Sequence, residues 1–453
     1  MISSHRIRTS IVVASVLMMP VGCASYRPAP LDPAATTLMP PDLAIISADA
    51  ERIDRPYIRP QVIDWTQPLS PDALAIVAVL ANPDLKALRS KLGVAEAQAF
   101  SARLLPDPTF QGNFDKLLAG PDAFDALGGQ IALDLNQLRT ARITRRGGEA
   151  SQRQVRLDLA WSEWQTAGQA RLQGVRILSL VRQLVIAQAS AASAEALFAS
   201  AERAGARGDI SGSDVDVRRQ AALDAAVRAR ATENDLVTAR GELNKLLGLP
   251  PETSLRLAAG AEPVAPPPAP ALVAQAVDRR LDLQALRSGY DAAEADVHKA
   301  VLDQFPNLSL AIAGARDTSD NRTIGPAVGF TLPLWNRNRG GIAVATATRG
   351  QLKAEYEARL FQTRAEITAA TVGLSVQRRQ RTVLIAQMPA IRRIAVSSMA
   401  AERRGDLSAA AAATAEQAVR DRELTLLQLD QQIAENSIAL ELLSGSLSEG
   451  WSR

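Results

Sequence analysis

The strongest constraint on this chain is that it repeats itself. Asp84–Ser90, with the sequence DLKALRS, returns as Asp282–Ser288, DLQALRS, at an offset of 282 − 84 = 198. Arg207–Ser211, RGDIS, returns as Arg404–Ser408, RGDLS, at an offset of 404 − 207 = 197. An offset that stays nearly constant from the start of each half to its end predicts two structural repeats of the same design.

Composition limits what these repeats contain. Aromatic residues make up only 4% of the 453 residues, whereas alanine and leucine are abundant, which favours long helices in close contact. The net charge of +3 gives no large basic surface and argues against nucleic acid as a partner. With a single cysteine, no internal disulfide is possible.

The N-terminus has the pattern of an export signal. A basic start and an apolar core over 11–19 precede Cys23, which predicts a lipoprotein signal peptide over 1–22 and lipidation of Cys23. Pro20 stands where such signals usually carry leucine, so a chance cysteine beside a conventional cleavage site is the alternative. By resemblance to bacterial lipoproteins, Ala24 in place of aspartate favours the outer membrane.

The chain divides into segments with different compositions. We predict that each repeat contains, in order, a short helix, two strands, a very long helix, a turn and a returning helix. The predicted segments are a lipidated extended N-terminal segment (23–70), the first repeat (71–260), a proline-rich crossover (261–270), the second repeat (271–447) and a C-terminal tail (448–453).

The predicted strands alternate between apolar and small or polar residues. Such alternation fits a sheet with one face toward lipid and the other toward a wet lumen, and it also fits a soluble half-buried hairpin. The apolar positions are Phe110, Gly112 and Phe114; Ile131, Leu133 and Leu135; Leu308, Leu310 and Ile312; and Val328, Phe330, Leu332 and Leu334.

The long helices favour the membrane interpretation. From about 140 to 206 there is no proline and the apolar residues follow helical spacing, so this helix would be on the order of 100 Å long. Its counterpart, about 341–403, contains Pro389, which predicts a kink or local unwinding. We find no later run of about 20 apolar residues, so a chain that spans a membrane would do so with strands.

Four strands per chain are too few to close a barrel. An open sheet edge in lipid leaves backbone groups unsatisfied, each at a cost of several kcal/mol. Two chains would give eight strands, a barrel filled by its own side chains, whereas three give twelve and leave a lumen. We therefore predict a mainly α protomer with a small β part, forming a homotrimer whose 12-stranded barrel continues into a long α-helical barrel.

Four segments of the chain resemble the TolC-type outer-membrane efflux proteins, in the lipoprotein branch that serves resistance-nodulation-division (RND) pumps. The resemblance covers about residues 70–447. The segment Leu332–Gly340, LPLWNRNRG, looks like the family's strand-to-helix segment and is closest to heavy-metal efflux members. The other three signals are Asn82–Leu85, Pro306–Leu308 and the two Arg-Gly-Asp turns.

This resemblance implies a function and partners. The chain would be a passive exit duct for metals or drugs, anchored in the outer membrane and extending into the periplasm, joined by a periplasmic adaptor to an inner-membrane RND pump. One alternative is the outer-membrane subunit of a type I protein secretion system, which only the partners distinguish. A periplasmic adaptor lipoprotein is less consistent with two helical hairpins and few strands. A soluble coiled-coil scaffold would leave the lipid signal and the alternating strands without a purpose.

The two Arg-Gly-Asp turns are the main candidate sites. Glycine permits the left-handed conformation that ends a helix, and the following serine can cap the next helix, so turn chemistry alone explains part of the pattern. By resemblance the turns form the periplasmic tip, where their charges would make a gate or an adaptor-docking surface. The candidate residues are Arg207, Gly208, Asp209, Ser211, Asp214, Asp216, Arg404, Gly405, Asp406 and Ser408. Ala411 and Ala413 replace the last two aspartates in the second repeat, so an acidic ring would be uneven.

A second set of residues marks the change from strand to helix. Glycine would let the chain bend there and let neighbouring segments pack closely, and proline would stiffen the exit from the strand. These residues are Pro333, Gly340, Gly341, Gly147 and Gly148.

The sequence offers little for catalysis. Outside the predicted signal peptide, His298 is the sole histidine, and once Cys23 is lipidated no thiol remains for a nucleophile or a His/Cys zinc site. Met39, Met388 and Met399 are too dispersed to form a soft-metal cluster. We therefore expect no enzyme activity, no cofactor and no resident metal.

Overall fold

The computed structural model describes residues 26–31, 41–55 and 57–448. The predicted signal peptide and Cys23 lie outside the described residues, as does all of the predicted C-terminal tail except Ser448. The chain forms two compact units, Met1–Pro40 and Pro41–Arg453. The described residues of the first unit, 26–31, contain no helix or strand, and all helices and strands below belong to the second unit.

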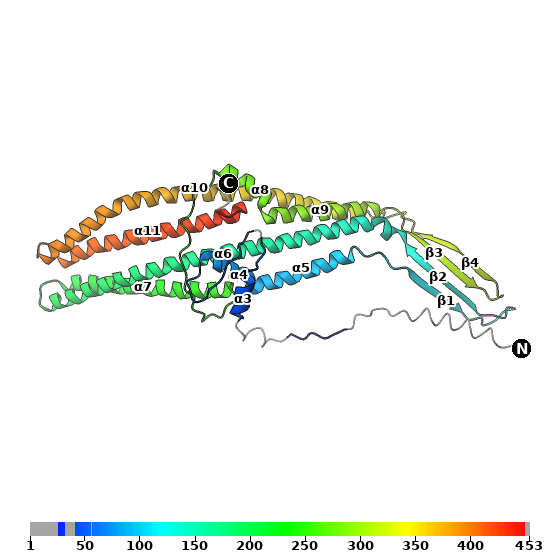
Figure 1. The fold of residues 1–453 in the computed structure, drawn as a ribbon, viewed down its shortest axis with the longest axis horizontal. Coiled ribbons are helices and arrows are strands. Elements are labelled where there is room, and N and C mark those ends of the chain that lie inside the picture. The colour runs from blue at the N-terminus through cyan, green and yellow to red at the C-terminus, as the bar shows by residue number, and fades with distance from the viewer. Residues whose placement is uncertain (1–25, 32–40, 56, 449–453) are drawn as a thin grey trace. The chain divides into compact units, whose positions relative to one another are not determined.

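The second unit contains the two predicted repeats in the same order (Figure 1). After α3 (Leu43–Ala50), the first repeat comprises α4 (Pro71–Ala81), α5 (Pro83–Ser101), β1 (Thr109–Asp115), β2 (Ala126–Asp134), α6 (Leu135–Ala206) and α7 (Gly212–Leu246). The second comprises α8 (Ala269–Arg279), α9 (Leu281–Leu302), β3 (Leu308–Arg316), β4 (Arg322–Phe330), α10 (Arg339–Arg403) and α11 (Ala409–Ser444).

Each predicted short helix is in fact two helices. Asn82 ends α4, and its side chain accepts a hydrogen bond from the Leu85 amide at 3.0 Å, which starts α5. The Asn82 amide also donates to the Leu246 carbonyl at the end of α7, which fixes the break against the returning helix. In the second repeat Arg280 stands at the matching break.

The four strands form one antiparallel sheet in the order β1-β2-β3-β4. Its register confirms the two-faced pattern, because Phe110 pairs with Ile131 and Ile131 with Ile312, so their side chains share a face. The opposite face carries Gln111, Gln130 and Ala313 at the neighbouring register position. Two strand boundaries were predicted wrongly. Leu135 already begins α6, and β4 ends at Phe330, before Leu332 and Leu334.

Long helices pair beyond the sheet. Figure 1 shows α7 running back along α6 and α11 running back along α10, with both connecting turns at the end away from the sheet. The 72 residues of α6 correspond to roughly 110 Å. The helix α10 continues through Pro389 without local unwinding, and Figure 1 shows it curved.

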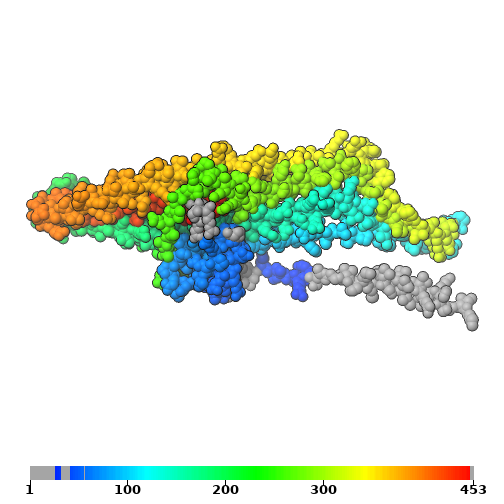
Figure 2. All heavy atoms as spheres, turned by 45° about the horizontal axis from the view of Figure 1, so that its top comes forward, coloured from blue at the N-terminus to red at the C-terminus, as the bar shows by residue number. Residues whose placement is uncertain are grey.

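Two apolar cores lie partway along the helices. One joins α4 and the segment before it to α6 and α7, around Leu74, Ile76 and Leu243. The other joins α8 to α10 and α11, around Leu272 and Leu374. We call this level the waist. Figure 2 shows the blue residues 41–81 gathered beside the long helices there.

The structure also qualifies one expectation about membrane spans. Among the described residues, α6 is the one helix with an 18-residue stretch long and apolar enough, by length and composition, to cross a membrane. Its mean hydropathy is 1.3, and 6% of the stretch is buried. A core helix of a soluble protein passes the same test.

Candidate functional site

The two predicted tip turns have nearly the same backbone. Gly208 and Gly405 adopt φ values of 78° and 82°, the left-handed conformation that glycine adopts without strain. In both turns the aspartate amide bonds back to a helix carbonyl at 2.9 Å, from Asp209 to Ala204 and from Asp406 to Ala401. The glycines therefore end α6 and α10.

The serines that follow begin the returning helices. Ser211 accepts from the Asp214 amide at 3.1 Å, and Ser408 accepts from the Ala411 amide at 3.3 Å. Ser211 also donates to the Asp214 carboxylate at 2.6 Å. Each serine thus satisfies an amide that a helix N-terminus leaves free.

The charges of the turns are paired within one protomer. Arg207 lies 2.8 Å from Asp209, and Arg404 lies 2.9 Å from Asp406. Asp216 lies 3.3 Å from Arg219, one turn farther along α7. These side chains are at least half exposed, so each pair contributes about 0–1 kcal/mol and is available for exchange with other partners.

The strand-to-helix residues fall into two groups. Pro333, Gly340 and Gly341 do follow β4 at the start of α10. Gly147 and Gly148, however, lie inside α6, about three turns after it begins.

These two glycines do not bend the chain, because α6 is continuous there. A Cβ at Gly147 would lie 3.3 Å from Ala295 of α9, and one at Gly148 would lie 2.9 Å from Ala102 beside α5. Their role in the structure is close packing of α6 against two neighbours.

The sequence did not single out the residue that starts α10. Asn338 is left-handed, with φ 50°, and its side-chain amide donates to the Ala300 carbonyl at 2.8 Å. From the other side, Arg139 of α6 donates to the Leu302 carbonyl at 2.9 Å. The last turn of α9 is therefore held by side chains from both adjacent long helices.

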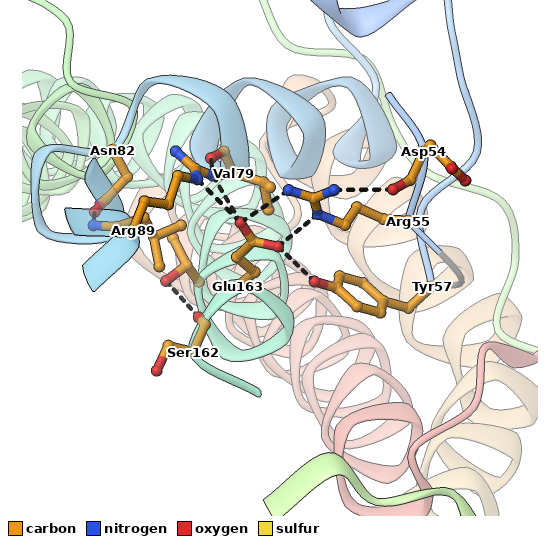
Figure 3. A network of polar contacts seen from close by, with 10 residues as sticks. Asp54, Arg55, Tyr57, Val79, Asn82, Arg89, Ser162 and Glu163 are labelled. Carbon is orange, nitrogen blue, oxygen red and sulfur yellow. Dashed lines mark hydrogen bonds and ion pairs between the residues drawn. The ribbon is translucent and has the colours of Figure 1, made fainter. Parts of the chain in front are cut away.

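A buried carboxylate at the waist was also missed. Glu163 of α6 is 1% exposed and accepts from Arg55 at 2.7 Å, from the Tyr57 hydroxyl at 2.7 Å and from Arg89 at 2.8 Å (Figure 3). Two separate segments, the one around Arg55 and Tyr57 and the helix α5, thus converge on one side chain of α6. Tyr57 also packs edge-on against Trp164 at 5.5 Å between ring centroids.

Electrostatics keep Glu163 ionised. Burial alone would raise its pKa, but the hydrogen bonds from Arg55, Tyr57 and Arg89 outweigh burial and hold the pKa below its usual range. Burial, together with the adjacent carboxylate, raises the pKa of Tyr57, which stays a neutral donor. A permanently charged, fully engaged carboxylate is suited to fastening segments together, not to exchanging protons.

Two further contacts join the repeats. Arg171 of α6 forms an ion pair with Glu441 of α11, and the Trp164 indole donates to the Leu442 carbonyl at 3.3 Å. Gly168 lies directly under Leu442, whose side-chain atoms would be 2.5–2.9 Å from a Cβ there. This seam holds the last helix of the second repeat against the first.

Another buried ion pair lies near this seam. Arg280 and Asp282 are 2.7 Å apart, and the Arg280 guanidinium stacks 4.9 Å from the Trp161 ring centre. Within the described ranges, no group of three His, Cys, Asp or Glu side chains is placed to hold a metal ion.

Comparison with known proteins agrees with this architecture. Residues 272–446 match the family described as Outer membrane efflux protein. The chain is 24% identical over 312 residues to the cobalt-zinc-cadmium resistance protein CzcC of Cupriavidus metallidurans, covering 69% of this chain and 74% of the relative.

Solved structures share the fold. The Campylobacter jejuni CmeC outer membrane channel superimposes with a TM-score of 0.70 at 15% identity, over 83% of this chain and 85% of that one. The outer-membrane channel OprN gives 0.69 at 17% identity, over 95% and 99%. The predicted resemblance is thus confirmed: the chain has the fold of the TolC-type outer-membrane channels, and its second repeat matches the outer membrane efflux protein family.

Proposed function

We propose that this chain is one subunit of a homotrimeric outer-membrane channel, which acts as the passive exit duct of a tripartite efflux system. The observation that carries the proposal is the sheet. One face is apolar and the other is small or polar, and among the described residues both outer strands have a free edge. β2 runs directly into α6, and short loops join β1, β3 and β4 to α5, α9 and α10.

The free edges require other copies of the chain. The strands β1 and β4 each pair on one side only, so their outer backbone groups need partners before the sheet can lie in lipid. Three copies supply twelve strands and leave a lumen, whereas two would make a barrel filled by side chains. The small and polar face would then line the lumen.

Metal ions are the favoured cargo. The relative CzcC is named for resistance to cobalt, zinc and cadmium. The candidate residues of this chain contain no soft-metal ligands, so ions would pass through it without being chelated by such groups. Energy would come from the partner pump, and the chain itself would catalyse no reaction.

The tips are the proposed contact with a periplasmic adaptor, which would join the channel to an inner-membrane RND pump. Arg207, Asp209, Arg404 and Asp406 are exposed and weakly paired, so their pairs can be exchanged for contacts with an adaptor. Repetition by threefold symmetry would bring these charges together at a constriction. A gate made of weak pairs opens at low cost.

Lipidation of Cys23 would anchor the same chain to the outer membrane. Replacing Cys23 with alanine should abolish labelling by radioactive palmitate in growing cells, whereas Ser25→Ala should leave labelling unchanged. Continued labelling of the Cys23 variant would refute the anchor.

The function is tested on the purified full chain. Native mass spectrometry in detergent should give a mass three times that of one protomer, and planar bilayers should show discrete conductance steps. Deleting the gene should sensitise the host to cobalt, zinc or cadmium. A stable monomer without conductance would refute the channel, while conductance without metal sensitivity would refute only the cargo.

A further inference from the structure

A group of unpaired arginines lies where the sheet meets the helices. We call Arg142, Arg146, Arg337 and Arg339 the arginine collar. All four are exposed, and none contacts a carboxylate in the part of the chain that the structure describes. The first two lie within about three turns of the end of β2, and the other two lie between β4 and the first residue of α10.

Several carboxylates near the collar have other partners. Asp134 caps the first turn of α6, accepting from the Asn136 amide at 2.8 Å. Glu149 accepts from Arg145 at 3.0 Å and pairs with Arg103 at 3.1 Å, and Asp303 pairs with Lys299. Asp107 and Asp296 also lie near this level, and among the described residues neither forms an ion pair with a collar arginine.

The charged turns at the far end differ. There Arg207, Arg219 and Arg404 each pair with an aspartate within the same turn or helix. The arginines of the tip turns are therefore neutralised locally, whereas those of the collar are not.

The collar adjoins a strongly exposed apolar strip. Trp335 is 87% exposed, and Leu332 and Leu334 are about two-thirds exposed. They lie between the apolar face of β4 and Arg337. The chain therefore passes in a few residues from apolar strand to tryptophan to arginine, which is the order found where a membrane protein crosses from hydrocarbon to the headgroup layer.

The helix face also fits this placement. Arg142 and Arg146 are four residues apart and share a face of α6. Gly147 and Gly148, which contact α9 and the end of α5, are about 100° and 200° farther round the helix than Arg146. Both arginines are exposed, although Arg139, one turn earlier on the same face, donates to the Leu302 carbonyl of α9.

We propose that the arginine collar binds the phosphate groups of anionic phospholipids in the periplasmic leaflet of the membrane that holds the sheet. The inference rests on the proposed function, because it takes the sheet to be inserted in a bilayer. A guanidinium donates two parallel hydrogen bonds to a phosphate, and it stays charged at any physiological pH. Several such groups near the end of the sheet give a preference for anionic over zwitterionic lipid.

The start of α10 favours phosphate as well. Asn338 makes no side-chain cap hydrogen bond, and its side-chain nitrogen donates to the Ala300 carbonyl at 2.8 Å. A Cβ at Gly340 would meet nothing within 4 Å. The Arg339 amide donates to the Asn336 carbonyl at 3.0 Å, which leaves the amides of Gly340 and Gly341 at this helix N-terminus, where negative charge is favoured.

The test measures lipid preference of the purified full chain. Mixed micelles would contain dioleoylphosphatidylglycerol as the anionic probe and dioleoylphosphatidylcholine as the zwitterionic one, and native mass spectrometry would count retained lipid. The wild type should retain the anionic lipid at least about tenfold better. The variant Arg142→Gln/Arg146→Gln/Arg337→Gln/Arg339→Gln should retain the two lipids about equally. Each arginine removed should lower the preference for the anionic lipid by roughly fivefold at most.

Two matched variants separate charge from structure. Replacing the same four residues with lysine should keep most of the preference. A control variant replaces four exposed arginines of the helices near the tips, which also have no carboxylate partner among the described residues, and should leave the preference unchanged. These are Arg203, Arg228, Arg230 and Arg393. If the quadruple glutamine variant does not fold by circular dichroism, Arg142→Gln and Arg337→Gln are tested singly.

The outcomes are distinct. No preference in the wild type, or an equal loss in the tip-side control, would overturn the proposal. Inorganic phosphate is then added to about 10 mM while the ionic strength is held constant near its physiological value. Loss of the lipid preference would assign the site to free phosphate and would overturn the proposal. Conductance in phosphatidylcholine bilayers reports on the channel separately, so an active channel without lipid preference would refute the collar alone.

Discussion

The guanidinium of Arg89 on α5 lies 2.8 Å from the carboxylate of Glu163 on α6. Arg89 also donates to the Val79 carbonyl, and the corresponding residue of the second repeat, Arg287, donates to the Val277 carbonyl at 3.1 Å. Both arginines therefore fasten their own helix to the end of the shorter helix before it. Only in the first repeat does this arginine also contact the buried Glu163, which in turn binds Arg55.

Removing the charge of Glu163 should loosen the waist. In Glu163→Gln, Arg55 and Arg89 lose their anionic partner and one hydrogen-bond acceptor is replaced by a donor, so we expect a loss of about 2 kcal/mol in the free energy of unfolding. Denaturant unfolding in detergent measures the loss, and limited proteolysis should cut residues 51–69 sooner.

The matched control is Glu96→Gln. Glu96 lies 3.4 Å from Arg156 of α6, and both side chains are about half exposed. Such a pair contributes little, so this variant should unfold like the wild type. An equal loss in both variants would contradict a special role for Glu163.

The same carboxylate predicts a pH dependence. Its pKa is lower in the folded chain than the value of about 4.3 for an unfolded glutamate. A depressed folded-state pKa adds stability above the unfolded pKa, and that stability is lost as pH falls through the folded pKa. The difference in unfolding free energy between wild type and Glu163→Gln should therefore be constant from pH 7 to about 5 and shrink below about 4.3. A difference that instead grew toward low pH would contradict the assignment.

The sequence predicted the sheet faces well because side-chain direction in strands alternates at every residue. The two-residue period at Phe110–Phe114 and Leu308–Ile312 survives pairing, so the register confirmed it. Strand ends were less predictable. Leu332 and Leu334 continue the alternation, although Pro333 between them lacks the amide that a further ladder bond would need.

Contacts between distant segments could not be predicted. Arg55 and Glu163 are 108 residues apart, and nothing in the local pattern around either one marks the other as its partner. The capping of α9 by Arg139 and Asn338 depends likewise on three helices meeting in space. The tip turns were easier to recognise, because glycine, aspartate and serine act there within a few residues of one another.

Gly168 should be intolerant of any side chain. In Gly168→Ala the new Cβ would lie within 2.9 Å of three atoms of Leu442, so α11 must shift or Leu442 must leave its rotamer, at a cost of about 1–3 kcal/mol. This cost should exceed the gain in helix propensity of about 1 kcal/mol. We expect a lower midpoint of thermal unfolding.

Gly93→Ala is the control for propensity. Gly93 lies in α5, and a Cβ there would meet nothing within 4 Å. This variant should be more stable than the wild type by about 0.5–1 kcal/mol. Stabilisation by both substitutions would show that the seam at Leu442 is not closely packed.

Reversing the aspartates of the two tip turns should open the resting channel. In Asp209→Lys/Asp406→Lys, each turn loses its arginine pair and gains a second cation, so the tips repel one another within the proposed trimer. We expect a higher resting conductance in planar bilayers, with an increase of several-fold at low salt and a smaller one at 1 M salt.

The control is Asp224→Lys/Asp421→Lys, which reverses the same charge at matching positions of α7 and α11. Each of these aspartates accepts a hydrogen bond from a glutamine one turn earlier. Unchanged conductance in the tip variant, or an equal rise in the control, would show that the tip charges do not hold the channel closed.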